Sequence, residues 1–415
     1  MLVCPTVYAV SVFFLNLKLQ ILDLHQGGIP SIRHGLCDNR WECNMNGILD
    51  MDKSNVKSDH SLQIVEFPHG GVTAHIVTAQ ATEETINDVI DQVTAEMAAR
   101  NARIAFQYVF GGRKFYPKAV SAIEKLDWPL TLLHGDACSG ENITGTQFIA
   151  LSDAKLNPVM DGDRIVGNWY ETADARYCLL GDLRADNLEL GREEQARAVF
   201  EKMEHLLKQA DMEFTDIART WLYLNNLLEW YDEFNVVRTN FFKEKGTFDK
   251  MVPASTGIGA GTAAGEEMVA ALLAVKPKHD NVKVFPVPSP LQCPALDYKS
   301  SFARAVEIDQ PGSRLLTISG TASIEPGGKT AHLGNTEKQI ELSMAVVHEI
   351  LKSRDMDWKN TARAIAYFKD VSEAHLLEKY CIANNLPELP VAISHADVCR
   401  HDLLFEIELD AVKIK

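Results

Sequence analysis

Two stretches of the sequence that lie 144 positions apart follow one pattern. Residues 207–223 read LKQADMEFTDIARTWLY, and residues 351–367 read LKSRDMDWKNTARAIAY. In both stretches the end of an amphipathic helix leads through a short loop into an apolar strand. Identities at a fixed offset indicate that one structural unit is repeated along the chain.

The segments around these stretches extend the repeat. The first helices of the two copies are predicted over 192–210 and 337–353, and the last strands over 268–275 and 403–412. Each copy follows the order strand, strand, helix, strand, helix, strand, strand.

A weaker third copy covers about residues 62–155. It has helices predicted over 84–99 and 116–126, with apolar strands around them. Chance similarity remains open for this copy, because many α+β domains share the order of elements.

We therefore predict an α+β chain of tandem modules, each a mixed β-sheet with two helices on one face. The uncovered sheet faces must be buried, and three modules can bury them against one another as a pseudo-trimer with clefts at the module boundaries. Links are expected near 156–168 and 277–285. The predicted units are a leader over 1–60, a divergent module over 61–160, a second module over 165–277 and a C-terminal module over 284–415.

Composition narrows the class of protein. The 415 residues are 46% hydrophobic and carry a net charge of −16, so the chain can fill cores but lacks the basic surface that binds nucleic acid. A few arginines in one cleft can still bind an anionic metabolite. The eight cysteines form no CxxC pair, and the histidines show no metal-ligand spacing, so we expect a reducing cytoplasm, no metal and no cofactor.

The start of the chain differs from the rest. Residues 1–17 are apolar but lack the basic segment of a secretory signal and are short for a membrane span. We expect no membrane association. The leader is predicted to be disordered or to precede the true start, with Met45 and Met51 as candidate starts; a membrane-proximal leader is the alternative.

Three further motifs carry a family resemblance. They are residues 300–305 (SSFARA), 318–324 (ISGTASI) and 396–408 (ADVCRHDLLFEIE), and the second module adds Arg238 and the stretch 219–223. With the repeat, they resemble the YjgF/Rid superfamily, whose single-module members form trimers with ligand sites between subunits. The third module is similar to the chorismatase family, enzymes of fused Rid-like modules. The resemblance implies hydrolysis of chorismate to pyruvate and a cyclic carboxylic acid.

The chain departs from these patterns at two points. Chorismatases typically have asparagine where this sequence has Leu222, which predicts the loss of one polar contact. Imine deaminases of the superfamily carry an arginine after a Pro-Ala pair, whereas the corresponding stretches here are 253–255 (PAS) and 390–392 (PVA). Deamination of the usual kind is therefore disfavoured.

Two carboxylates mark the candidate catalytic strand. Glu406 and Glu408 are two residues apart, so their side chains share one face of a strand that is otherwise apolar. Poor solvation raises the pKa of a carboxyl group and provides a general acid near neutral pH. The resemblance assigns the acid to Glu406 and leaves Glu408 as a tuning or substrate-binding group. The alternative is an exposed edge strand on which neither residue reacts.

The remaining site candidates would bind substrate or steer the product. Cys399 lies seven residues before Glu406, where the resemblance implies direct formation of a hydroxybenzoate; a small core residue is the alternative. Arg304, Arg219 and Tyr223 are candidates for binding a dianionic substrate, because guanidinium groups match carboxylates in two-point geometry. Arg363 occupies the repeat position of Arg219, so a structural role for both remains open.

Two functions follow from this reading. The leading one is a chorismatase-like hydrolase that acts at a cleft between the second and third modules on a small carboxylated metabolite. The alternative is a Rid-like protein that binds or deaminates another carboxylated metabolite.

The glycine-rich segment 257–265 follows no strand-to-helix pattern and is predicted to be a hairpin rather than a nucleotide-binding loop. An internal pseudo-trimer also favours a monomer.

Overall fold

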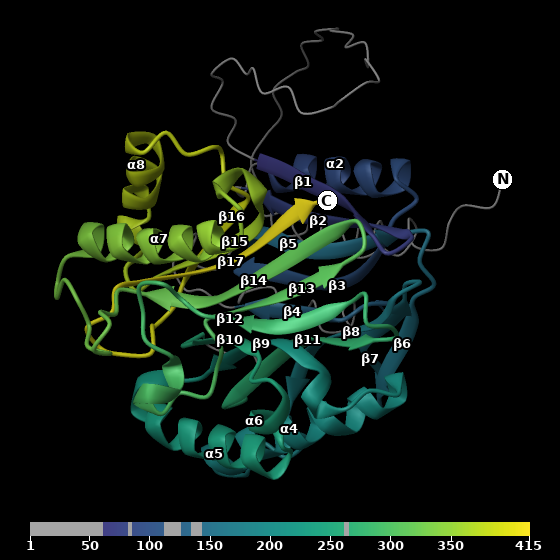
Figure 1. Ribbon diagram of the computed structural model, residues 1–415, viewed down its shortest axis with the longest axis horizontal. Helices are drawn as coiled ribbons and strands as arrows, with labels where there is room; N and C mark the ends of the chain where they lie inside the picture. Colours follow the sequence, from purple (N-terminus) through teal and green to yellow (C-terminus); the bar gives the residue numbers. More distant parts are fainter. Residues whose placement is uncertain (1–60, 82–84, 112–125, 134–142, 261–264) are drawn as a thin grey trace, which may run out of the picture.

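The strands of the chain form mixed sheets whose covering helices lie on the outside of the molecule (Figure 1). The computed structural model describes residues 61–81, 85–111, 126–133, 143–260 and 265–415. Within these ranges there are three sheets. The predicted leader over 1–60 lies outside them, and so do residues 261–264 of the glycine-rich segment.

The first sheet has the strand order β1-β2-β5-β3-β4 and packs against α2. The helix predicted over 116–126 falls almost wholly outside the described residues. The elements are β1 (Ser61–His69), β2 (Val72–Gln80), α2 (Ile86–Ala99), β3 (Arg103–Gly111), β4 (Leu130–Leu133) and β5 (Ile143–Ser152).

The second sheet has the order β10-β9-β11-β8-β7-β6. Its strands are β6 (Asn157–Asp161), β7 (Arg164–Glu171), β8 (Ala175–Arg184), β9 (Ile217–Leu224), β10 (Ala254–Ile258) and β11 (Met268–Pro277), and its helices are α4 (Arg192–Leu207), α5 (Tyr231–Glu244) and α6 (Thr247–Lys250). The link predicted near 156–168 is wrong, because the β6–β7 hairpin occupies these residues and extends the sheet.

The third sheet has the order β12-β13-β14-β17-β15-β16. Its strands are β12 (Lys283–Val287), β13 (Ala305–Gln310), β14 (Ser313–Ala322), β15 (Thr361–Phe368), β16 (Val391–His395) and β17 (Phe405–Ile414), and its helices are α7 (Thr336–Ser353) and α8 (His375–Ala383). The second predicted link is shorter than expected, since β11 runs to Pro277 and β12 begins at Lys283.

All three sheets repeat one connectivity, which confirms the tandem modules. Each has a parallel edge pair, β3 with β4, β9 with β10 and β15 with β16, next to a long central strand, β5, β11 or β17. Three copies of this order in one chain explain the sequence repeat.

The aspartate that the two repeat stretches share ends the first helix of its module. Asp211 and Asp355 both adopt the left-handed conformation with φ of 53°. The next amide, of Met212 or Met356, donates a 3.0 Å hydrogen bond to a carbonyl five residues earlier in the chain. This is the Schellman arrangement, in which aspartate and asparagine are tolerated because their short side chains permit positive φ. In the first module, Asn101 occupies this position with φ of 47°.

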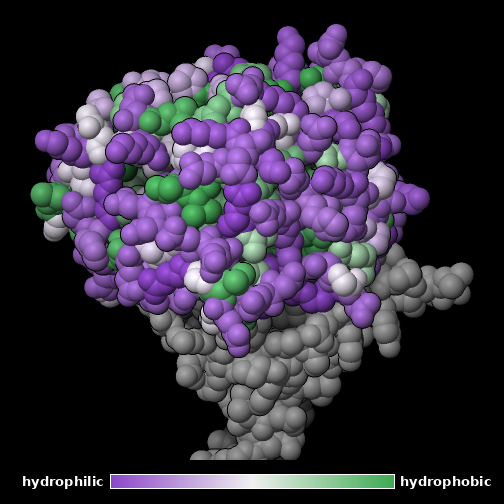
Figure 2. All heavy atoms as spheres, turned by 90° about the horizontal axis from the view of Figure 1, so that it is seen from below, coloured by the Kyte–Doolittle hydropathy of each residue, from purple (hydrophilic) through white to green (hydrophobic). Residues whose placement is uncertain are grey.

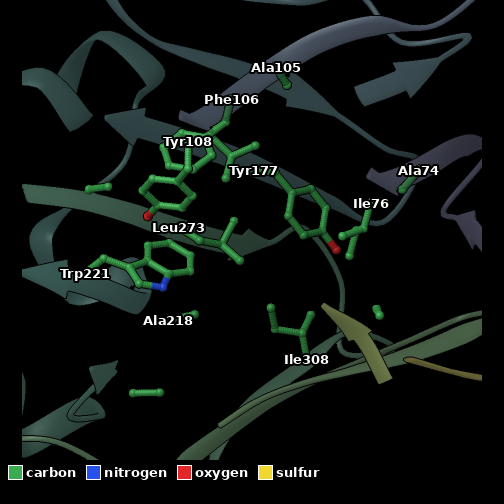
Figure 3. Close-up of a cluster of buried hydrophobic side chains, with 14 of the residues drawn as sticks. Ala74, Ile76, Ala105, Phe106, Tyr108, Tyr177, Ala218, Trp221, Leu273 and Ile308 are labelled. Carbon is green, nitrogen blue, oxygen red and sulfur yellow. The ribbon is translucent and has the colours of Figure 1, made fainter. Parts of the chain in front are cut away.

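One core takes side chains from all three sheets. Phe106 and Tyr108 of β3, Trp221 of β9 and Ile308 of β13 belong to the same buried cluster. Figure 3 shows Tyr108 and Trp221 side by side at its centre, with ring centroids 5.9 Å apart. The sheets therefore cover one another's inner faces, whereas a threefold axis through them stays a prediction.

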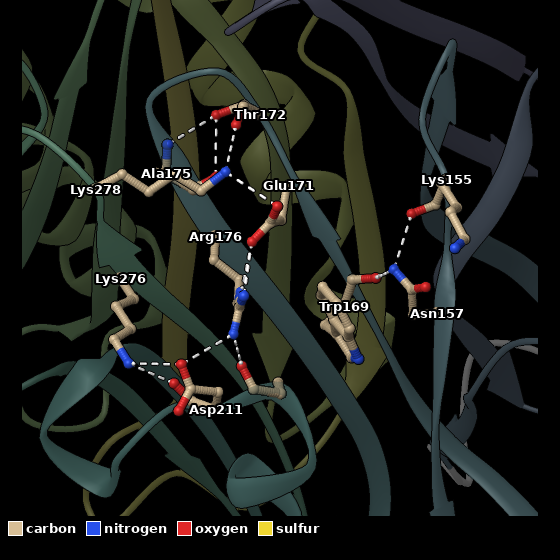
Figure 4. Close-up of polar contacts among 11 residues, drawn as sticks. Lys155, Asn157, Trp169, Glu171, Thr172, Ala175, Arg176, Asp211, Lys276 and Lys278 are labelled. Carbon is tan, nitrogen blue, oxygen red and sulfur yellow. Dashed lines mark hydrogen bonds and ion pairs between the residues drawn. The ribbon is translucent and has the colours of Figure 1, made fainter.

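Polar contacts hold the outer end of the second module together (Figure 4). Arg176 binds Glu171 at 2.7 Å and Asp211 at 3.3 Å, and Lys276 binds the same Asp211 at 3.2 Å. The segment that follows α4 is thus bound to strands β8 and β11.

The face drawn in Figure 2 is dominated by hydrophilic side chains with small apolar patches between them. Among the described helices, none is long and apolar enough to cross a lipid bilayer.

A buried histidine at the junction of the modules makes folding sensitive to acid. His69 lies 3.0 Å from the hydroxyl of Tyr170 and 2.7 Å from the amide nitrogen of Gln310, and burial lowers its pKa from 6.5 to about 4. In the unfolded chain this histidine takes up a proton below about pH 6.5. The folded state does not, so stability is full above pH 6.5 and is lost as the pH falls toward 4.

We expect His69 alone to lower the free energy of unfolding by about 2 kcal/mol between pH 7 and pH 5. Urea unfolding of the wild type and of His69→Gln at both pH values measures this contribution, because glutamine keeps a hydrogen-bonding group that does not titrate. An equal pH dependence in the two proteins would contradict it.

Candidate active site

A cavity of about 800 Å³ opens between the second and third modules. Helix α5 and strand β10 form its wall on the second module. On the third module the wall is formed by residues 296–304, the end of β14, the loop at Cys399 and strand β17. Volumes of this size accommodate small-molecule ligands.

Glu406 lies in this wall on a central strand. Strand β17 pairs with β14 on one side, where Glu406 is opposite Ala322, and with β15 on the other, where it is opposite Tyr367. The side chain of Glu406 is 5% exposed. The alternative of an exposed edge strand is therefore wrong for both carboxylates.

The carboxyl group of Glu406 retains a proton at neutral pH. Burial, and then the negative charge of Glu408, raise its pKa from 4.5 to about 8, against the opposing effects of Arg219 and Arg304. No hydrogen bond to this carboxyl group forms among the residues that the structure describes. A neutral, unengaged carboxyl in a cavity wall is what a general acid requires.

Gly320 provides the space for this carboxyl group. A Cβ atom at position 320 would lie 1.9 Å from Oε1 of Glu406 and 3.2 Å from Cγ2 of Thr256. The Gly320 amide also donates a 3.1 Å hydrogen bond to the Thr256 hydroxyl, which holds β14 against β10. The ISGTASI motif thus requires glycine at this position, because the Glu406 carboxyl group lies too close to the backbone to leave room for a side chain.

Replacing Gly320 by alanine should displace the Glu406 carboxyl and lower catalysis by about 100-fold, as misplacement by 1 Å does in other sites. Turnover and a crystal structure of the variant measure the two effects together. Gly327→Ala is the matched control, because a Cβ there meets only Glu325 Oε1 at 4.0 Å. Full activity of Gly320→Ala would show that the carboxyl position does not matter.

Arg304 places a guanidinium group in the same cavity. Its Nε and Nη2 atoms donate hydrogen bonds of 3.0 and 2.8 Å to the carbonyl of Cys293, and its guanidinium stacks 5.4 Å from the rings of Tyr298 and Phe302. No carboxylate pairs with it in the described part of the chain. The guanidinium also interacts with the hydroxyl of Tyr298, a neutral partner that leaves its charge uncompensated.

Arg238 is a second unpaired guanidinium, to which the sequence motif gave no separate role. It is 1% exposed on α5 and lines the cavity. Its Nη2 donates to Asn235 at 2.5 Å, but its Nε has no partner. Burial lowers its pKa. Arg238 follows Phe234 by four residues, which places both on one face of the helix. This spacing was the signal available in the sequence, but it also fits a surface arginine.

Cys399 also lines the cavity, next to the acid. Burial, and then the nearby Glu406, raise the pKa of its thiol to about 12, so the group is a neutral thiol at physiological pH. The cysteine thus contributes shape and a weak hydrogen-bond donor rather than a thiolate. Its neighbour Arg400 lines the cavity too and donates to the carbonyl of Gly328 at 2.8 Å.

The structure does not bring Arg219, Tyr223 and Glu408 to the cavity wall. All three are 1% exposed or less. They lie behind the wall, where the inner faces of the sheets meet, because β9 turns the alternate side chains Arg219 and Tyr223, and β17 turns Glu408, toward the common core. Arg219 binds Glu408 at 3.0 Å, and Arg363 binds the same carboxylate. Both arginines therefore form buried ion pairs with Glu408, as expected for the structural role that the sequence left open.

Leu222 lies on the opposite face of β9. It is fully buried in the core between the second sheet and its helices, away from the cavity. Leu222 thus does not line the cavity, and the loss of one polar contact at this position stays a prediction. In the described ranges no group of three His, Cys, Asp or Glu residues could hold a metal ion.

Comparisons with known proteins agree with this geometry. Residues 163–274 match the family "Chorismatase FkbO/Hyg5-like, N-terminal". The chain resembles the chorismatases. It is 26% identical over 223 residues to a chorismatase of Streptomyces rapamycinicus and 26% identical over 245 residues to a 3-hydroxybenzoate synthase of Streptomyces hygroscopicus.

A crystal structure of a chorismatase shares the fold. The superposition covers 74% of this chain and 92% of the chorismatase chain, with a TM-score of 0.56 and 19% sequence identity. The resemblance to the chorismatases that the motifs predicted is thus confirmed. The match with the Streptomyces rapamycinicus relative spans 64% of that protein and 47% of this chain, so the chain covers less than two thirds of the relative's length.

Proposed function

We propose that the chain is a chorismatase-like hydrolase that cleaves the enolpyruvyl ether of chorismate. One observation carries the proposal: a buried Glu406, whose pKa is raised to about 8, faces a cavity that is also lined by three arginines, Arg238, Arg304 and Arg400, with no carboxylate partner among the described residues. The cavity offers an acid for an enol ether and cations for a substrate with two carboxylates. The resemblance to the Streptomyces chorismatases supports it.

The reaction begins with proton transfer from Glu406 to the methylene carbon of the enol ether. An oxocarbenium ion forms at the adjacent carbon, and a water molecule adds to it. The Glu406 carboxylate takes up the proton that this water releases, and the hemiketal collapses to pyruvate and the ring alcohol. The acid is regenerated, and atoms and charges balance.

Binding and product choice fall to the other cavity residues. Arg238 and Arg304 bind the two carboxylates in this proposal, and the low dielectric of the site strengthens both interactions. Cys399 sits beside the acid and would select between a dihydroxycyclohexadiene carboxylate, the direct product of the hydrolysis, and a hydroxybenzoate, which requires that the ring also lose one water molecule. Similarity to a 3-hydroxybenzoate synthase supports the second product.

Incubation of the purified chain with chorismate, with pyruvate measured and the ring product identified, tests the function. Because the acid must be protonated, kcat/KM should be constant below pH 8 and should fall tenfold per pH unit above it, following a pKa of about 8. Folded protein that releases no pyruvate would rule out this substrate.

Binding without turnover is the second candidate. The unpaired Nε of buried Arg238 favours any small carboxylate, whatever chemistry follows. Thermal-shift measurements with chorismate, hydroxybenzoates and 2-oxo acids separate the two candidates. Stabilisation by ligands that are recovered unchanged supports a binding protein.

We also propose that the chain works as a cytoplasmic monomer of three modules. The shared core already covers the inner face of each sheet, so no second copy is needed to bury them. Sedimentation measurements test the oligomeric state.

A further inference from the structure

We propose that Glu408 is a positioning residue: its carboxylate, bound by two arginines behind the cavity wall, controls whether the neighbouring Glu406 holds a proton. Its catalytic meaning rests on the proposed function, but the protonation of Glu406 can be measured without turnover. Three features of the structure carry the inference: the contacts of Glu408, the balance of charge around it and its spacing from Glu406.

The contacts of Glu408 are those of an ion-paired carboxylate. Its side chain is completely buried and accepts hydrogen bonds from Nη2 of Arg219 at 3.0 Å, from Nε1 of Trp221 at 2.9 Å and from Nη2 of Arg363. Two guanidinium groups and an indole donor thus engage both of its oxygens.

The surrounding charges balance one another. Arg363 also binds Asp410 at 3.0 Å, and Arg219 donates a 2.6 Å hydrogen bond to Thr256. Both guanidinium groups stack on the ring of Trp221, at 5.0 and 5.3 Å. The buried group therefore contains two cations, Arg219 and Arg363, and two anions, Glu408 and Asp410, with a net charge of zero.

Within this neutral group, the anion nearest to Glu406 along the chain is Glu408. Residues two apart on a strand lie about 7 Å apart on one face. At that distance in a dry interior, one carboxylate opposes the ionisation of the other.

Other groups act on Glu406 from every side of its pocket. Glu408 on β17 disfavours its ionised form, whereas Arg219 from β9 and Arg304 before β13 favour it. Arg238 and Tyr231 of α5, and the thiol of Cys399, also line this cavity. Without Glu408, burial alone would oppose these arginines.

Among the described strands, the arrangement is present in the third module alone, and it uses residues of the second module; in the first module the equivalent positions are Gly145 and Gln147 of β5. The ladder positions of Glu406 and Glu408 correspond to Val269 and Ala271 in β11. Arg219 and Trp221, which hold Glu408, come from β9 of the second module. The acid of one module is thus controlled by its neighbour.

Two charge changes with opposite expected signs test the inference. The infrared band of the protonated Glu406 carboxyl in the ligand-free protein is identified by its loss in Glu406→Gln, and its decrease with pH gives the titration midpoint. Glu408→Gln leaves the buried group with a net positive charge and should lower this midpoint by about one pH unit or more. Arg363→Gln leaves a net negative charge and should raise it.

Glu388→Gln, which removes an exposed carboxylate that does not line the cavity, should leave the midpoint unchanged. Opposite shifts in the two buried variants support the inference, because a merely structural role would not reverse sign. Unchanged midpoints, or shifts of one sign, overturn it.

If Glu408→Gln does not fold, Arg363→Gln decides alone: an upward shift supports the inference, and no shift or a downward shift overturns it. The high-pH limb of kcat/KM should move with the infrared midpoint. Shifted midpoints in a protein that does not turn over chorismate would leave the inference standing and reject the proposed function.

Discussion

Glu406→Gln should lower the rate of pyruvate release from chorismate about 1,000-fold while making the protein more stable. Glutamine keeps the size of the side chain and loses the transferable proton, and general acid catalysis contributes rate factors of about 100 to 10,000. Single-turnover measurements of pyruvate at saturating chorismate report the loss in the chemical step.

The gain in stability follows from the raised pKa. Above pH 4.5 the unfolded chain carries an ionised Glu406, whereas the folded state holds the proton up to about pH 8. Folding at pH 7 must therefore take up a proton, which costs about 3 kcal/mol. Glutamine removes this cost, and the difference should vanish below pH 4.5.

Denaturant unfolding of the two proteins at pH 7 and at pH 4 measures this difference. Glu388→Gln is the matched control, since its carboxylate is exposed and should change neither rate nor stability. An active Glu406→Gln protein would mean that another group delivers the proton. An inactive variant with lower stability would indicate that it lost activity through misfolding.

The sequence was sufficient to predict the modules and part of the site. The 144-residue repeat predicted the shared connectivity, because identical helix ends and strands at one offset require identical local structure. The motifs singled out Glu406, Cys399 and Arg304 as site candidates, and these three residues line one cavity. These three lie on segments whose order along the chain already places them at the same end of the third sheet.

The remainder depended on packing that no local pattern records. Alternation along β9 shows that Arg219 and Tyr223 share a face, but both faces of the second sheet are buried, one against helices and one against the other modules. Only docking of the modules decides which face reaches the cavity. Arg238 was passed over for the same reason, since a helix pattern does not distinguish a buried arginine from a solvated one.

Arg238→Met should raise the KM for chorismate by about 10- to 100-fold, which is the range expected when a charge-assisted contact to one carboxylate is lost. The same change should increase the free energy of unfolding by about 1–3 kcal/mol, because a buried charge without an ionic partner opposes folding. Asn235 accepts a hydrogen bond from this guanidinium and the Tyr231 side chain also interacts with it, but no carboxylate of the described residues pairs with it. Methionine fills a similar volume between Phe234 and Phe302 without the charge.

Steady-state kinetics and urea unfolding check both effects in one preparation. Arg192→Met is the matched control, because Arg192 is partly exposed, pairs with Glu229 at 2.8 Å and lies outside the cavity. That variant should keep its KM and lose a little stability. Opposite signs for stability in the two variants would identify Arg238 as a group retained for its ligand at the expense of folding. A destabilised Arg238→Met protein with unchanged KM would instead make this arginine part of the scaffold, and Arg304 and Arg400 would then have to bind the substrate's carboxylates.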